Sequence, residues 1–85
     1  MRLPVIKHIN TFIEKNDADY VEETIEVLEN LTEAKGLKDE EIDVLGELLS
    51  NLYGGLEVNK EIKKGKSERE ALNGFMQRVM GSIGK

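Results

Sequence analysis

The feature that most constrains this chain is a long periodic stretch between residues 37 and 64. Its apolar side chains recur at steps of three and four residues, a spacing that forms one face of a helix but scatters over both faces of a strand. Acidic residues open the stretch and lysines close it, as the helix dipole favours. The apolar positions of this predicted helix are Ile42, Leu45, Leu48, Leu49, Leu52, Tyr53 and Leu56.

A glycine pair lies inside this stretch, at Gly54 and Gly55. Gly46, Ser50 and Gly54 form a row of small residues, which lets another helix approach closely although each glycine costs about 1 kcal/mol relative to alanine. Beyond Gly55 the apolar face changes direction, beginning at Val58. We therefore predict a third helix that is bent or broken near Gly54–Gly55, with packing as the favoured role of the glycines and a functional hinge as the alternative.

Helix start and stop signals divide the rest of the chain. Pro4 suits a first helical turn, and Asp17 suits the N-cap of a second helix. Gly36 and Gly65 fit the left-handed position that follows a helix, and the Ser-x-x-Glu sequence at 67–70 is a capping box. The sequence predicts an all-α fold with one domain over residues 1–85, a compact bundle of four helices near residues 4–15, 17–34, 39–64 and 67–82.

Length and composition exclude several classes of protein. A chain of 85 residues buries only about 60% of its unfolded surface, so dimerisation would supplement a modest core. The absence of cysteine excludes disulfides and thiolate chemistry, and the single histidine, His8, argues against a zinc or di-iron site. We therefore expect no metal, and no cofactor because no cofactor-binding motif is present. Because no apolar run approaches the length of a membrane span or a signal peptide, we also expect a cytoplasmic protein with no membrane association.

An acidic helical face is the most unusual chemical feature. Residues 17–34 contain seven acids and no base, and like charges four residues apart cost a helix about 0.2–0.5 kcal/mol per pair. Such a face could bind a basic protein partner, or it could be a solvated surface neutralised within the molecule. A divalent cation is disfavoured because the carboxylates spread along the helix. The candidate partner-binding residues are Asp19, Glu22, Glu23, Glu26, Glu29 and Glu33.

A basic segment offers the alternative of nucleic-acid binding. Glu68 and Glu70 would lie at the start of the following helix and would meet a negatively charged groove, so DNA or RNA is disfavoured. Residues 65–67, Gly-Lys-Ser, resemble the end of a P-loop only by chance, because Lys60 occupies the position of the required glycine. The candidate basic residues are Lys60, Lys63, Lys64, Lys66 and Arg69.

Several short segments together resemble a domain-of-unknown-function family of short bacterial proteins. The resemblance implies a small, stand-alone, cytoplasmic, all-helical protein, and it implies no activity, ligand or site residue. The segments that carry it are LPVIKH at 3–8, DYVEETIE at 19–26, LKDEE at 37–41, GEL at 46–48, ALN at 71–73 and FM at 75–76.

The sequence therefore predicts a non-enzymatic protein–protein interaction module that self-associates and offers an acidic face of its second helix to a basic partner. A small nucleic-acid-associated regulator that uses residues 60–69 is the alternative. No set of residues with the composition of a catalytic site is present, so an enzyme is the least favoured class.

Overall fold

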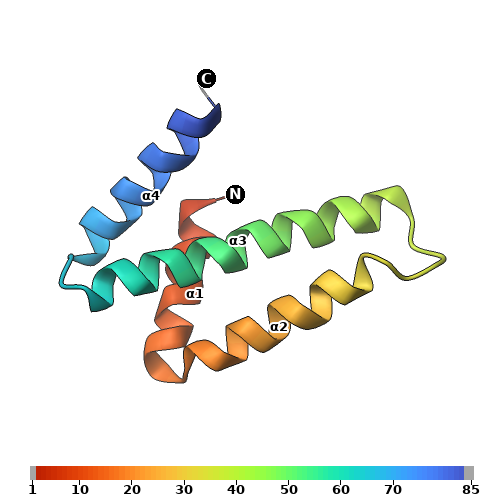
Figure 1. Ribbon diagram of the computed structural model, residues 1–85, viewed down its shortest axis with the longest axis horizontal. Helices are drawn as coiled ribbons and strands as arrows, with labels where there is room; N and C mark the ends of the chain where they lie inside the picture. The colour runs from red at the N-terminus through yellow and green to blue at the C-terminus, as the bar shows by residue number, and fades with distance from the viewer. Residues whose placement is uncertain (1, 84–85) are drawn as a thin grey trace.

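Figure 1 shows the computed structural model of the chain, which describes residues 2–83. The chain forms α1 (Leu3–Lys15), α2 (Ala18–Leu31), α3 (Asp39–Lys63) and α4 (Glu68–Ile83), and no strand occurs within the described residues. The predicted all-α fold of four helices is confirmed. In this part of the chain, no helix combines the length and the apolar character needed to cross a membrane.

The predicted caps are present. The Asp17 carboxylate accepts a hydrogen bond from the backbone N–H of Asp19 at 3.0 Å and so starts α2. Ser67 and Glu70 form both bonds of the capping box, each at 3.1 Å. Gly65 adopts a φ of 112°, and the N–H groups of Gly65 and Lys66 close the end of α3 on two of its last carbonyls.

Helix α2 ends three residues earlier than predicted, at Leu31 instead of residue 34. Thr32 donates its hydroxyl hydrogen bond to the carbonyl of Glu29, and the next two N–H groups bond three residues back instead of four. A threonine hydroxyl competes in this way for helical carbonyls. The apolar pattern thus continues past the point at which the helical hydrogen bonds stop.

The helices form a thin, broad molecule with extents of 43 × 35 × 17 Å. Helices α2 and α3 run antiparallel as a long hairpin, and α1 crosses α3 steeply (Figure 1). Helix α4 turns back after α3, packs on its C-terminal half and rises obliquely away from it. Two buried clusters hold them together. Ile13, Val21 and Ile25 join α1 and α2 to α3, and Val58 joins Phe75 and other side chains between α3 and α4.

The glycine pair is the crossing point of α1 and α3. A Cβ atom on Gly54 would lie 2.9 Å from Ile6 Cδ1, and one on Gly55 would lie 2.9 Å from Ile9 Cβ. Helix α3 continues through the pair without a break, so the close approach of α1 accounts for these glycines. The predicted close approach is confirmed at Gly54, whereas Gly46 in the same row faces open space.

Asparagines are buried where the helices cross. The Asn59 side chain donates to Asn10 Oδ1 at 3.0 Å, and Asn10 donates to Glu68 Oε2 at 3.3 Å, which links α3, α1 and α4. Asn51 accepts a bond from the backbone N–H of Arg2 at 3.0 Å and so fixes the start of α1 on α3. These pairs satisfy polar groups that would be costly to bury alone.

The apolar faces of the predicted helices are wider than the buried core. Several large apolar side chains are therefore exposed, because no neighbouring helix covers them. The exposed residues are Phe12, Tyr20, Val27, Leu31, Ile42, Val44, Leu48 and Tyr53 on the first three helices, and Met80 on α4.

Candidate functional site

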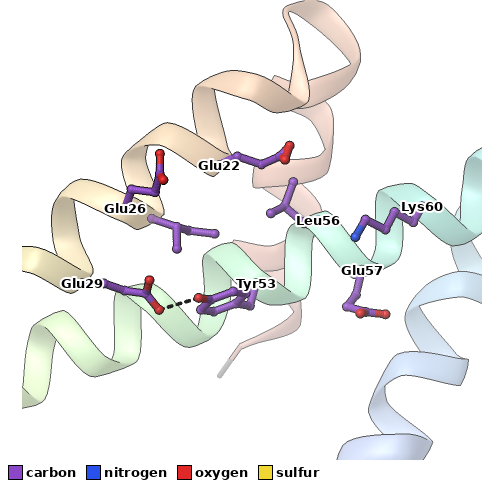
Figure 2. A pocket seen from close by; sticks show the side chains of 8 residues that line it. Glu22, Glu26, Glu29, Tyr53, Leu56, Glu57 and Lys60 are labelled. Carbon is purple, nitrogen blue, oxygen red and sulfur yellow. Dashed lines mark hydrogen bonds between the residues drawn. The ribbon is translucent and has the colours of Figure 1, made fainter.

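A groove of about 430 Å³ runs between α2 and the C-terminal half of α3 (Figure 2). Apolar side chains form its base and ionisable side chains form its walls. We call it the acidic groove, and its lining residues are Glu22, Ile25, Glu26, Glu29, Tyr53, Leu56, Glu57 and Lys60.

The periods of the two helices explain how these residues meet. On α2, Glu22, Glu26 and Glu29 are separated by four and three residues and share one side of the helix, next to buried Ile25. On α3, Tyr53, Leu56 and Lys60 follow the same spacing and face α2 (Figure 2). The antiparallel hairpin thus places three carboxylates of α2 along a strip of α3 that contains one lysine.

Tyr53 connects the two walls of the groove. Its hydroxyl donates a hydrogen bond to Glu29 Oε2, drawn as a dashed line in Figure 2. That bond favours the protonated phenol and raises the pKa of Tyr53 above its ordinary value of 10.0, with burial and the negative charge of Glu29 acting in the same direction. The Tyr53 side chain remains 47% exposed, so its ring is open to a ligand.

Most of the negative charge in the acidic groove has no close counter-ion. Within residues 2–83, no lysine or arginine nitrogen lies within 4.0 Å of the carboxylates of Glu22, Glu26 or Glu29. Glu57 has a partner in Arg78 at 3.6 Å. Lys60 lines the groove but lies beyond ion-pair distance of the α2 carboxylates. The groove is therefore an exposed, largely uncompensated negative surface.

The structure divides the six predicted partner-binding residues into two groups. Glu22, Glu26 and Glu29 line the acidic groove, whereas Asp19, Glu23 and Glu33 are exposed outside it. The sequence analysis missed Tyr53 and Glu57 as groove residues. Tyr53 lies at an apolar position of the helical period and was assigned to the packing face. It is exposed because it lies on an edge of α3 that α2 does not cover, although its neighbours Leu52 and Gly54 are packed.

The predicted basic residues do not form one surface. Lys64 and Lys66 both pair with Glu61, at 3.2 Å and 2.7 Å, and these bonds lower the pKa of the Glu61 carboxyl below its ordinary value of 4.5. Lys60 lines the acidic groove, and Lys63 lines a separate hollow near the α1–α2 turn. Arg69 is exposed on α4, so the segment 60–69 divides its positive charge among four places.

The carboxylates of the acidic groove lie along the groove and do not converge on one point. In the part of the chain that the structure describes, no three histidine, cysteine or acidic side chains are grouped to hold a metal ion. Spread carboxylates beside an aromatic ring suit an extended cationic ligand better than a single ion.

The fold and this groove define a small all-helical protein with an acidic surface between two antiparallel helices. The chain belongs to a family of unknown function, DUF6952, whose profile matches residues 1–84. We found no matching protein among curated proteins and no matching fold among solved structures.

Proposed function

We propose that this protein is a non-enzymatic interaction module of the cytoplasm that binds a basic segment of a partner protein in the acidic groove. The supporting observation is the row of three α2 carboxylates without a counter-ion, opposite a half-exposed tyrosine. Helix stability alone disfavours like charges at this spacing. A basic ligand would relieve that repulsion.

The chemistry of the groove favours arginine over lysine in the partner. A guanidinium group can bond a carboxylate through two parallel hydrogen bonds and can stack on the exposed face of Tyr53. The aliphatic stem of the same side chain would lie on Leu56 at the base of the groove. A lysine would gain the charge but neither the bidentate bond nor the planar stacking.

The test is capture of partners from the native cell with matched variants. A triple variant, Glu22→Gln, Glu26→Gln and Glu29→Gln, removes three charges from the groove. The control triple, Asp19→Asn, Glu23→Gln and Glu33→Gln, removes the same charge from positions outside it. Both variants change the formal net charge from −5 to −2, so a non-specific effect of net charge would appear equally in both.

We expect mass spectrometry to identify proteins that the wild-type chain and the control triple retain and that the groove triple loses. Direct binding of a recovered partner's basic segment should then weaken at higher salt, because exposed charges are screened. Equal retention by both triples, or equal loss from both, would contradict the proposal.

A further inference from the structure

We propose that the face of the α2–α3 hairpin opposite the acidic groove is a homodimer interface, on which a second copy of this chain packs. This inference goes beyond the binding of a basic partner and uses different residues. The surface, which we call the open apolar face, is made of side chains 41–60% exposed. They are Phe12, Tyr20, Val27, Leu31, Val44 and Leu48.

The open apolar face continues the surface that α1 already covers. On α3, Val44 and Leu48 lie in the same helical row as Gly55, spaced by four and seven residues, and Ile9 of α1 packs on Gly55. Helix α1 has 13 residues and crosses the 25-residue α3 steeply, so it covers one end of this row and leaves the other bare (Figure 1). The row is thus built as packing surface along its whole length.

Helix α2 contributes a matching stripe. Tyr20, Val27 and Leu31 lie seven and four residues apart and share one side of α2. Tyr20 meets Phe12 of α1 edge to face, with ring centroids 5.9 Å apart, at the covered end. Leu31 lines an open, predominantly apolar hollow of about 420 Å³ with Val44 at the uncovered end.

The accessible surface and the radius of gyration of the chain both exceed those of a globular monomer of this size. Its accessible surface is 6117 Å², against about 5,100 Å² for a globular monomer of 9.6 kDa. Its radius of gyration is 13.8 Å, against about 12 Å for 85 residues. The excess of about 1,000 Å² is similar to the roughly 800 Å² that each partner buries in a stable interface of standard size.

The charge distribution is compatible with a second copy as the occupant. None of the six side chains is charged, and a two-fold interface centred on them leaves Glu40 and Glu41, which line the hollow beside Leu31 and Val44, at its solvent-exposed rim. The groove carboxylates lie on the far side of α2, in a molecule 17 Å thick, which exceeds the Debye length of about 8 Å at physiological salt. Two copies of an acidic chain can therefore meet on this face while their groove charges remain in solvent.

The test is the molar mass in solution, measured by light scattering after gel filtration and by sedimentation equilibrium. We expect twice the chain mass of 9.6 kDa for the wild type. Val27→Lys and Val44→Lys should each raise the dimer dissociation constant at least about 100-fold, because each places a charged side chain twice in an interface that excludes water. Ile42→Lys is the matched control, since Ile42 is 40% exposed on the opposite side of α3, and it should remain dimeric.

Lysine is chosen because it lowers the net negative charge, so a monomeric Val27→Lys or Val44→Lys variant could not be explained by added repulsion between acidic chains. Retention of helical circular dichroism would show that the half-exposed substitutions leave the fold intact. A wild-type chain that stays monomeric at about 100 μM, a concentration at which even a weak specific dimer forms, would overturn the inference. So would dimers that the two valine variants leave unchanged. The groove triple should remain dimeric, which separates this result from the test of partner binding.

Discussion

The glycine at the crossing of α1 and α3 allows the sharpest test of the fold. In Gly55→Ala the new Cβ would lie 2.9 Å from Ile9 Cβ and closer still to Ile9 Cγ2, whereas unstrained carbon atoms approach to about 3.5–4.0 Å. Both atoms belong to the branched base of Ile9 and cannot rotate away independently. The two helices must therefore move apart, and overpacking of this kind costs about 1–3 kcal/mol.

Gly46→Ala is the matched control, because Gly46 lies in the same helix with nothing within 4 Å of a new Cβ. Both substitutions gain the same helix propensity, about 1 kcal/mol, so their difference isolates the crossing. We expect Gly46→Ala to exceed Gly55→Ala in free energy of unfolding by about 1–3 kcal/mol. Urea denaturation followed by circular dichroism measures the difference, and a melting-temperature gap of at least about 4 °C should accompany it.

If the two variants were equally stable, α1 could not cross α3 at Gly55 as described. A gain at Gly46 and a loss at Gly55, by contrast, would place α1 on α3 from stability measurements alone.

Two further predictions concern polar groups. Asn59→Leu leaves Asn10 Oδ1 buried without its donor, so the free energy of unfolding should fall by about 1–3 kcal/mol. The double variant with Asn10→Leu should lose less free energy of unfolding than the sum of the two single losses. Additive losses in urea denaturation would contradict the pairing of Asn10 and Asn59. Because Lys66 and Lys64 lower the pKa of Glu61 in the folded state, the stability that Glu61 contributes is fully present above its ordinary pKa of 4.5 and is lost as the pH falls below that value. The urea midpoint of Glu61→Gln should therefore lie below that of the wild type at pH 7 and approach it at acidic pH, and a gap that widens in acid would refute the assigned direction.

Much of the fold follows from local rules that the sequence displays. The cap at Asp17, the left-handed glycine at 65 and the capping box at 67–70 each act within a few residues, so the helix limits beside them could be predicted nearly to the residue, whereas the end of α2 was predicted three residues too late. The change of direction between Leu52 and Val58 was interpreted as a bend or break near Gly54–Gly55. In the structure α3 continues through the pair, and the two directions face two buried clusters.

The crossing geometry could not be predicted in the same way. Periodicity shows which residues share a face of one helix, but it does not show how much of that face a neighbour covers. Ile42 and Leu48 therefore share the predicted apolar face of α3 with Leu49 and Leu52, which pack on a buried cluster, and yet are exposed. Asn10 and Asn59 are buried for the complementary reason, since the steep crossing of α1 brings two polar side chains together and lets each satisfy the other.

Only part of the candidate site could be predicted from the sequence, for a related reason. The sequence identified an acidic side of α2, but only the position of α3 decides which acids lie in a groove and which lie on open surface. Glu22 and Glu23 are neighbours in the chain, and only Glu22 lines the groove. Tyr53 lines the groove because α2 leaves one edge of α3 uncovered. This depends on how the two helices pack, which the local sequence pattern does not show.

The most direct measurement of the central proposal is a nuclear magnetic resonance titration of the ¹⁵N-labelled protein with a short arginine-rich peptide, repeated with the matching glutamate-rich peptide. We predict that the arginine peptide shifts the backbone amide signals of the groove-lining residues more than those of the acids outside the groove, and that the groove triple abolishes these shifts while the control triple keeps them. The groove-lining signals are those of residues 22, 25, 26 and 29 on α2 and residues 53, 56, 57 and 60 on α3. Shifts that follow the exposed acids at residues 19, 23 and 33 equally, or that survive in the groove triple, would contradict it.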